Sequence, residues 1–563
     1  MIFGKGMANV REIAPEDIFL DSSNLPDRDD PQIEGRVVRP LSSRAIAGVG
    51  VLFALALLVF GVRIFNLEIV NGAVYADISK NNRLDRTVEF ASRGIITDRT
   101  GEKLAWNIAS GTTTGNVFGM REYAVSGLAH LLGYVQYPKA DASGTWWREE
   151  IIGVSGVESA FDDVLAGVNG SSMIETNAVG EVQGGGIVVQ PKSGIDLTLS
   201  VDAEVQSSLF SILSAHAKQQ GFVGGAAVIM DARTGEVIAL VSFPEYDNVA
   251  FAEGNTKAVQ AASKDARSPL LNRAVSGLYA PGSIVKPIFA AAALNERLID
   301  PETEILSTGA ITIPNPYDPE RPSVYRDWTV HGLIDMREAL AVSSDEYFYT
   351  IGGGHGSQKG LGIKLLDDYA RRFGLGGVTG IALFGEEEGV IPTPEWKAAV
   401  FGPDDPWRIG NTYHTAIGQY GFQITPLQAV RFTAAVANGG KLLVPQILAH
   451  ATPQFSNIGI PDSYLQIVRE GMRLAVTSAR QDATVKVLNM SGIEIAAKTG
   501  TAQIGAKNEW INSWSVGFWP ANDPKYAYAA VLEKAPAGTL SGAAPGLRPF
   551  FEWLITNKPE YIN

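Results

Sequence analysis

Three short stretches of the chain carry side chains that together suit acyl transfer. Ser283 and Lys286 lie three positions apart, Ser343 and Asp345 follow further along, and Lys498 opens the sequence Lys-Thr-Gly-Thr near the C-terminus. The set supplies a hydroxyl nucleophile, an amine that can accept its proton, a second hydroxyl and a cation that can hold a carboxylate. The combination predicts an enzyme that works through a serine acyl intermediate.

The surroundings of Ser283 predict how it is presented. A Pro-Gly pair precedes it and the apolar run 288–294 follows, which is the pattern of a chain break and then a buried helix. Ser283 is therefore expected in the first turn of that helix, where free N–H groups and the helix dipole favour negative charge. Lys286 is expected on the same helix face.

Apolar runs bounded by turn residues predict the element that carries Lys498. The expected strands are 226–230, 237–241, 493–497, 513–519 and 526–532. The strand 493–497 leads into Lys498 and is expected at the edge of a sheet. Because helical stretches separate the two groups of strands, the pattern indicates an α+β fold with one antiparallel sheet.

Further segments carry a resemblance to a known family. They are 93–101 and 153–158 upstream, and 231–239, 272–274, 279–283, 416–419 and 425–428 around the three stretches above. In these segments the chain resembles the class B penicillin-binding proteins. The resemblance implies a single N-terminal transmembrane helix, a small β-rich pedestal domain and a C-terminal transpeptidase domain with a five-stranded antiparallel sheet flanked by helices. Residues 325–328 and Asp345 resemble the elongation-specific branch, penicillin-binding protein two.

The resemblance also implies the reaction, in which Ser283 attacks the penultimate D-alanine of a peptidoglycan stem peptide and a neighbouring amine resolves the acyl-enzyme into a cross-link. β-Lactams should acylate the same serine, and no metal or organic cofactor is required. The expected catalytic residues are Ser283, Lys286, Ser343, Asp345 and Lys498. The expected substrate-binding residues are Thr499, Gly500, Thr501 and Trp328, with Gln419 lining or supporting the cleft. The backbone N–H groups of Ser283 and Thr501 are expected to bind the oxyanion.

Asp345 complicates the role of Lys286 as the base. An exposed lysine has a pKa near 10.4, so burial and the neighbouring Lys498 must lower the pKa of Lys286 before it can accept a proton. An ionised Asp345 would instead stabilise the ammonium form. One solution is that Asp345 mainly accepts a hydrogen bond while Ser343 relays the proton. Another is that Asp345 caps the helix that follows it.

One stretch predicts a membrane span. Residues 45–62 are uncharged and mostly apolar, lie between Arg44 and Arg63, and would span about 27 Å as a helix. A buried core helix is the alternative. More arginines and lysines precede the span than follow it, which predicts a cytoplasmic N-terminus and an extracytoplasmic catalytic domain in a bacterial cell membrane. The expected parts are a disordered leader (1–44), the span (45–62), the pedestal (63–194) and the transpeptidase domain (195–563).

Composition excludes several other functions. The formal net charge of −14 argues against a nucleic-acid binder, which needs a basic surface. Cysteine is absent, so thiolate catalysis, disulfides and cysteine-based zinc sites are excluded. The six histidines are scattered along the chain and are interpreted as ordinary core or surface residues.

Other functions remain open at this point. The same serine and lysine set occurs in β-lactamases and in D-alanyl-D-alanine carboxypeptidases, which differ in what removes the acyl group. A non-catalytic cell-wall scaffold or a β-lactam sensor is a further alternative. Membership of the class also implies partners: peptidoglycan stem peptides, β-lactams as inhibitors, the membrane, and a multi-spanning glycosyltransferase that polymerises the glycan.

Overall fold

The computed structural model describes residues 43–81, 84–108, 118–124, 126–142, 144–176, 182–315, 318 and 320–562. Most of the predicted leader lies outside these residues. The chain falls into two compact units, and Arg86–Ile174 together with Gly184–Asn563 forms the larger one. Most of the predicted pedestal and all of the transpeptidase domain belong to that unit.

An apolar helix dominates the smaller unit. Helix α1 (Ser43–Phe65) runs into the π-helical turn η2 (Asn66–Val70), and α2 (Gly72–Asn81) follows. Within the described residues, Ile46–Val70 is the one helix long and apolar enough to cross a membrane, and the side chains of its most apolar stretch are all exposed. The apolar helix is thus longer than the predicted 45–62. Asn71 ends it, and a second helix begins at the next residue.

The pedestal is rich in β-structure, as predicted. One sheet has the strand order β11-β2-β3-β4 and another the order β1-β9-β10, and two short pairs are β5-β8 and β6-β7. The strands are β1 (Leu84–Glu89), β2 (Ile96–Thr97), β3 (Lys103–Ile108), β4 (Met120–Tyr123), β5 (Val135–Gln136), β6 (Lys139–Ala140), β7 (Trp146–Arg148), β8 (Ile152–Gly153), β9 (Gly170–Thr176), β10 (Val182–Val189) and β11 (Leu197–Thr198). The short helices are α3 (Ala129–Leu132), α4 (Gly156–Ala160) and α5 (Asp162–Leu165).

A buried ion cluster joins two segments of the pedestal that the sequence singles out separately. Arg93 Nε donates to Glu158 Oε2 at 2.6 Å, and Arg121 Nε donates to Glu158 Oε1 at 2.7 Å. Arg93 also pairs with Asp162 at 2.7 Å. The side chains of Arg93, Arg121 and Glu158 are almost completely buried. One oxygen of the Glu158 carboxylate therefore fixes the segment around 93 against the segment around 158, and the other fixes β4 there.

The transpeptidase domain contains the predicted five-stranded antiparallel sheet. Its strand order is β13-β12-β22-β21-β20. The strands are β12 (Gly224–Asp231), β13 (Val237–Phe243), β20 (Ala496–Ile504), β21 (Trp510–Trp519) and β22 (Tyr526–Pro536). β20 is an edge strand, as expected, but the predicted bounds 493–497 are wrong. The strand begins at Ala496, so the Lys-Thr-Gly-Thr sequence lies inside it and its backbone is held by β21.

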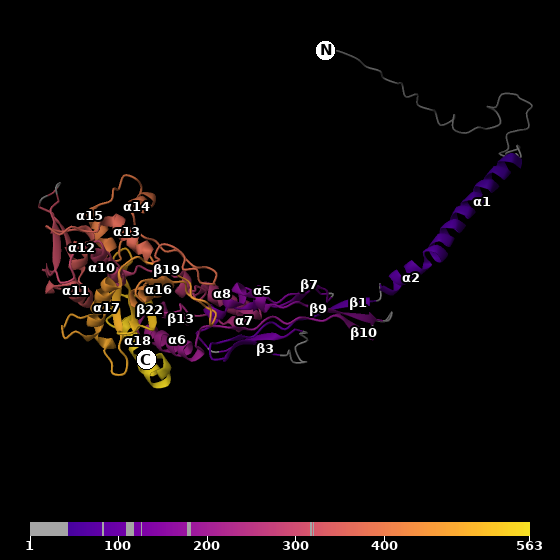
Figure 1. Ribbon diagram of the computed structural model, residues 1–563. Coiled ribbons are helices and arrows are strands. Elements are labelled where there is room, and N and C mark those ends of the chain that lie inside the picture. The colour runs from indigo at the N-terminus through magenta and orange to yellow at the C-terminus, as the bar shows by residue number, and fades with distance from the viewer. Residues whose placement is uncertain are drawn as a thin grey trace, which may run out of the picture. The chain divides into compact units, whose positions relative to one another are not determined.

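Helices cover both faces of this sheet. Helices α6 (Ala203–Gln220) and α18 (Ala543–Asn557) lie side by side (Figure 1) and pack in one core cluster with alternate residues of β12, Ala227 and Ile229. Helix α16 (Pro426–Ala437) packs on the other face with Ala226, Val228 and Met230. This alternation is the two-residue period of a strand buried on both sides.

The remaining elements form a mainly helical region around α10 (Lys286–Asn295). Every residue of α10 up to Leu294 is buried, which is the behaviour of a helix that is apolar on all sides. Its surroundings include α11 (Met336–Val342), α12 (Asp345–Gly353), α13 (Gly362–Arg372), α15 (Ile409–Ala416) and α17 (Asp462–Thr477). The smaller elements are α7 (Asn248–Ala252), α8 (Thr256–Lys264), α9 (Arg273–Ser276), α14 (Pro394–Phe401), η3 (Gly282–Val285), η4 (Lys486–Leu488), η5 (Pro559–Tyr561), β14 (Ile305–Ser307), β15 (Ala310–Ile313), β16 (Ser323–Arg326), β17 (Gly332–Ile334), β18 (Lys441–Leu443) and β19 (Phe455–Asn457).

Candidate active site

A cleft with a volume of about 920 Å³ brings the predicted site residues together. Its lining includes Ser283, Trp328, Ser343, Asp345, Thr499, Gly500 and Thr501, and also Gln419. The two remaining predicted residues, Lys286 and Lys498, are fully buried and bonded to Ser343. Residues far apart in the chain thus converge on one site.

The nucleophile candidate lies on a short helical turn. Ser283 belongs to the 3₁₀ turn η3, and α10 starts only at Lys286. The prediction that Ser283 lies in the first turn of the α-helix is therefore wrong, because Ser283 lies in the 3₁₀ turn immediately before that helix. Two contacts hold the approach to this turn: Trp514 Nε1 donates to Ala280 O at 3.0 Å, and Gly282 N donates to Gly418 O at 2.9 Å. The turn is therefore fixed from the sheet on one side and from the loop after α15 on the other.

Gly500 allows the edge strand to approach this turn. A Cβ atom at Gly500 would lie 2.7 Å from Pro281 O and 3.2 Å from Ile284 N, which are backbone atoms that cannot move aside. Likewise, a Cβ atom at Gly282 would lie 3.5 Å from Thr501 N. The backbones that carry Ser283 and Thr501 are thus in direct contact. This close approach explains why position 500 is a glycine, and Gly500 also lines the cleft.

Ser343 occupies a sharp turn between two helices. Its φ of +58° is left-handed, a conformation that a residue other than glycine adopts only when its surroundings impose it. Helix α11 ends before it and α12 starts after it. Ser344 caps α12, because its side chain accepts a hydrogen bond from Tyr347 N at 3.2 Å. The alternative that Asp345 is the cap is therefore wrong, and its carboxylate instead accepts a hydrogen bond from Lys286.

Lys286 uses its amine on the Ser343 turn. Its Nζ lies 2.6 Å from Asp345 Oδ1, 2.8 Å from Ser343 O and 3.4 Å from Ser343 Oγ. Among the hydrogen bonds of the described residues, none joins Lys286 to Ser283. Lys286 and Asp345 therefore form the ion pair that complicates the role of Lys286 as the base.

Lys498 approaches the same hydroxyl from the sheet. Its Nζ lies 2.7 Å from Ser343 Oγ and 2.9 Å from Thr499 O, and the side chain is completely buried. Burial and the nearby charge of Lys286 hold the pKa of Lys498 well below its usual range, and Asp345 opposes the shift only in part. Ser343 Oγ thus lies within hydrogen-bond distance of two amines. One of them, that of Lys498, loses its proton readily because its pKa is lowered.

Trp328 forms part of the rim of the cleft. Its side chain remains about half exposed, although its Nε1 donates to Val342 O at 3.2 Å. This bond connects the rim to the helix end that precedes Ser343. Trp328 is therefore held in the lining of the cleft by a backbone contact next to Ser343.

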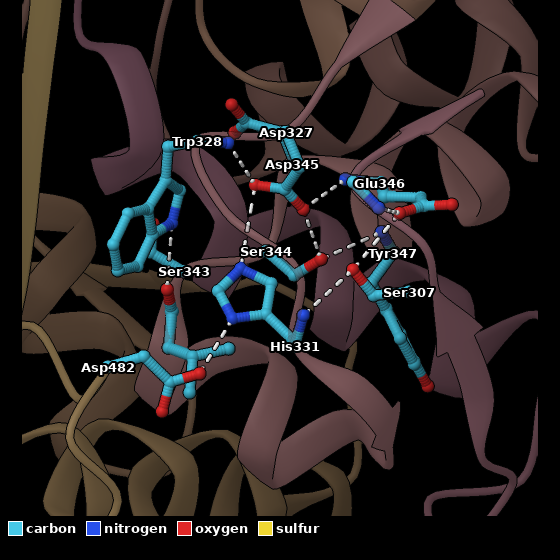
Figure 2. Close-up of polar contacts among 12 residues, drawn as sticks. Ser307, Asp327, Trp328, His331, Ser343, Ser344, Asp345, Glu346, Tyr347 and Asp482 are labelled. Carbon is cyan, nitrogen blue, oxygen red and sulfur yellow. Dashed lines mark hydrogen bonds and ion pairs between the residues drawn. The ribbon is translucent and has the colours of Figure 1, made fainter.

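Sequence reasoning missed four further residues at this site: Asp327, His331, His414 and Asp482. Asp327, His414 and Asp482 line the cleft, and His331 lies buried between Asp327 and Asp482 (Figure 2). The spacing of four positions between Asp327 and His331 was the available local signal, whereas nothing in the sequence joins Asp482 to them. Within the described part of the chain, no group of three or more His, Asp or Glu side chains is arranged to hold a metal ion.

Comparison with known families agrees with the geometry. The family described as "Penicillin binding protein transpeptidase domain" matches residues 225–552, more than half of the chain, and "Penicillin-binding Protein dimerisation domain" matches residues 117–199. The fold and the serine-lysine cleft fall within the first match. The chain therefore belongs to the class B penicillin-binding proteins, whose C-terminal domain is a peptidoglycan D,D-transpeptidase.

Individual relatives point to one branch of this family. The chain is 32% identical over 463 residues to the peptidoglycan D,D-transpeptidase MrdA of Acinetobacter baumannii, a match that covers 77% of this chain and 66% of that relative. It is 28% identical to Pseudomonas aeruginosa PBP2 in complex with WCK 5153, with a TM-score of 0.69 and coverage of 85% and 98%.

A third relative comes from a structure described as "Structural coordination of polymerization and crosslinking by a peptidoglycan synthase complex". It is 26% identical to this chain, with a TM-score of 0.68 and coverage of 92% of this chain and 99% of that one. The chain spans about two thirds of the length of the MrdA relative from Acinetobacter baumannii.

Proposed function

We propose that this chain cross-links peptidoglycan through an acyl-enzyme on Ser283. The observation that carries this proposal is the convergence of Ser283, the Ser343 turn and the edge strand β20 on one cleft, with two buried lysines bonded to Ser343. The substrate is a stem peptide that ends in D-alanyl-D-alanine. The similarity to MrdA and PBP2 supports this substrate class.

In the proposed acylation step, Ser283 Oγ attacks the carbonyl carbon of the penultimate D-alanine. Lys286 accepts the hydroxyl proton, the amide C–N bond breaks, and the leaving terminal D-alanine receives a proton through Ser343. In the second step the amine of a neighbouring stem attacks the ester, gives up a proton and releases Ser283. A serine hydroxyl needs a base in reach, and hydrogen bonds to such a base often shorten only once substrate is bound.

The Ser343 hydroxyl is well placed for this relay. It lies 2.7 Å from Lys498 Nζ and 3.4 Å from Lys286 Nζ, so a proton can pass along the three groups. For Lys286 to act as the base, its amine must be neutral. Asp345 must then accept a hydrogen bond from this amine rather than form an ion pair with it.

The edge strand is proposed to hold the terminal carboxylate of the substrate. Thr499 and Thr501 line the cleft and offer hydroxyl groups, while Lys498 supplies positive potential from behind. The backbone N–H groups of Ser283 and Thr501 are proposed to stabilise the oxyanion, at about 3 kcal/mol for each donor. β-Lactams would occupy the same place and acylate Ser283.

The setting of the enzyme is also proposed. The apolar helix Ile46–Val70 would anchor the chain once in the bacterial cell membrane, with the N-terminus in the cytoplasm and the catalytic domain outside. The proposed domain limits are 63–194 for the pedestal and 195–563 for the transpeptidase domain. The proposed role is elongation of the cell wall beside a multi-spanning glycosyltransferase, supported by the likeness to a chain of a peptidoglycan synthase complex.

The test uses the full chain in detergent. A fluorescent penicillin should label the wild type and should fail to label Ser283→Ala, while Ser263→Ala, a substitution outside the cleft, should label normally. Persistent labelling of Ser283→Ala would refute the nucleophile assignment. Mass spectrometry of the product from a lipid-linked substrate should then show a cross-linked dimer. Release of D-alanine without dimer would indicate a carboxypeptidase, and rapid hydrolysis of a chromogenic cephalosporin would indicate a β-lactamase.

A further inference from the structure

A buried carboxylate holds the start of the helix that carries Asp345. Asp327 Oδ2 accepts hydrogen bonds from Ser344 Oγ at 2.7 Å and from Glu346 N at 2.9 Å (Figure 2). These donors lie on either side of Asp345. Since Ser343 is held in a left-handed conformation immediately before them, the contacts of Asp327 help to impose the turn that aims Ser343 and Asp345 at the two lysines.

The same carboxylate belongs to a series of connected hydrogen bonds. Glu346 accepts from Ser307 Oγ at 3.0 Å and from Thr308 N at 2.8 Å, and Ser307 Oγ accepts from His331 N at 3.3 Å. Figure 2 shows these groups gathered around His331 and Asp327. The backbone positions of His331 and of the first turn of α12 are therefore tied to each other through Ser307 and Glu346.

The His331 imidazole lies between two carboxylates from different parts of the chain. Its Nε2 is 3.6 Å from Asp327 Oδ1, and its Nδ1 is 2.8 Å from Asp482 Oδ2. The His331 side chain is completely buried, and Nε2 has no hydrogen-bond partner among the described residues. The attraction between His331 and Asp327 is therefore mainly one of charge, and it requires the imidazolium form.

The charged groups around His331 favour that form. Burial alone would lower the pKa of His331, but the two aspartates outweigh it and raise the pKa above its usual value. Burial would raise the pKa of Asp327, but hydrogen bonds and the charge of Lys286 bring it to about 2. The pKa of Asp482 also lies at about 2, because its bonds to Arg480 and His331 outweigh its partial burial.

Other charged groups face this site as well. Arg480 lies 3.0 Å from Asp482 and donates to His331 O at 2.9 Å, and Arg480 is itself paired at 3.6 Å with Glu338 of α11. Glu346 faces it from α12. Asp482 lines the cleft beside Gln481, Ala483 and Thr484, so the site connects the cleft wall at 481–484 to the Ser343 turn.

We propose that His331 is a positioning residue that, as an imidazolium between Asp327 and Asp482, fixes the Ser343 turn against the 481–484 wall of the cleft. When His331 loses its proton, Asp327 and Asp482 no longer share a cation. The Ser343 turn is then held less firmly against the 481–484 wall. Acylation of Ser283 then slows because the second hydroxyl and both lysines shift from their working positions. This inference rests on the proposed function.

The test compares the acylation rate of the full chain in detergent with that of His331→Gln, from about pH 5.5 to about pH 9.5. Glutamine keeps a hydrogen-bond donor but cannot carry the charge. The ratio of wild-type to variant rate is expected to reach up to about 100 at the acid end and to fall towards one as the pH rises through the raised pKa of His331. Groups that titrate in both proteins, such as the lysines, cancel in this ratio.

A second pair of variants keeps the test valid if His331→Gln unfolds. Asp482→Asn removes only the outer, partly exposed carboxylate and keeps His331 in place, so the ratio of the wild-type acylation rate to its own should rise above one only in a pH window just below the raised pKa of His331. His355→Gln, an exposed histidine outside the cleft, should give a ratio of one at every pH. A ratio that does not change with pH overturns the proposal even if the variant is slow, because a merely structural role gives that result. Labelling of Ser283 in the wild type would leave the proposed function standing in that case.

Discussion

The pedestal and the catalytic cleft each bury two cations against one carboxylate, yet the two clusters behave differently. In the pedestal, Arg93 and Arg121 bind opposite oxygens of Glu158. In the cleft, Asp345 is paired with Lys286, while among the described residues Lys498 has a hydroxyl and a carbonyl as its hydrogen-bond partners. Both cations of the pedestal therefore bind a carboxylate, and Arg93 binds Asp162 as well, whereas in the cleft the carboxylate binds one of the two cations directly.

The choice of cation explains the difference. A guanidinium keeps its proton at any physiological pH and its planar fork matches a carboxylate, which suits a permanent structural link. An amine can lose its proton when burial and a neighbouring charge lower its pKa, as happens for Lys498. The arginines of the pedestal cluster thus stay charged, whereas in the cleft an amine can lose its proton.

Replacing the base candidate should give the largest effect. Lys286→Met removes the amine but keeps an unbranched apolar stem in a buried position. We expect the acylation rate to fall by about 10²- to 10⁴-fold, the usual contribution of a general base, while the unfolding temperature stays the same or rises. Stopped-flow labelling with a fluorescent penicillin and thermal unfolding provide the two measurements.

The matched control for this change is Lys264→Met, an exposed lysine on α8, which should change neither quantity. If Lys286→Met retained near-normal acylation, Lys286 would not be the base. The cleft would then not differ from the pedestal through a proton that Lys286 gains and loses. Lys498 would then be the first candidate because of its lowered pKa.

The opposite pattern is expected in the pedestal. Glu158→Gln leaves Arg93 and Arg121 buried without their shared negative charge, which should cost about 3–5 kcal/mol of the free energy of unfolding. The acylation rate per folded molecule should remain unchanged, because the cluster does not touch the cleft. Chemical denaturation measures the first quantity and active-site titration the second. Glu150→Gln, an exposed neighbour, should stay within about 0.5 kcal/mol of the wild type.

A third change tests whether the cleft depends on close backbone packing rather than on charge alone. Gly500→Ala places a Cβ atom 2.7 Å from Pro281 O, so β20 and the Ser283 turn must separate. We expect acylation to slow by up to about 100-fold, since small displacements of reacting groups are costly. Gly377→Ala, where nothing lies within 4 Å of the new atom, is the control and should be silent.

Local patterns were enough to predict much of the site. The spacing of Ser283 and Lys286, the chain break before them and the apolar run after them are short-range features, and four of the five predicted strands fall inside the observed ones. The end of β20 was missed because its backbone bonds to β21 extend the strand beyond 497 through polar residues that no apolar pattern marks.

Long-range contacts account for most of what the sequence could not provide. His331 and Asp482 are 151 positions apart and meet only after α11 and α17 have packed together. The alternative that Asp345 caps α12 arose because serine and aspartate both cap helices. The position of Lys286, whose amine donates to Asp345, depends on long-range packing and could not be read from the sequence. The role of Gly500 likewise depends on a backbone from a distant segment.

The smallest expected effect concerns stability and its dependence on pH. Because the pKa of Lys498 is lowered in the folded state, the unfolded chain binds the extra proton between that lowered pKa and about 10.4, and the wild type gains stability as the pH rises through this window. Lys498→Met removes the cost of burying the charge, so it should stabilise the fold by about 1 kcal/mol at low pH, and this gain should shrink towards the alkaline end of the window.

Denaturant unfolding at several pH values measures this gain, and the exposed Lys257→Met should show none at any pH. A gain for Lys498→Met that stays constant with pH would mean that the lysine is buried with its proton in place, like the pedestal arginines. Since the proposed relay needs an amine whose proton is easily lost, that result would remove the main physical difference between the two clusters and would leave Lys286 to carry the proton without help from its neighbour.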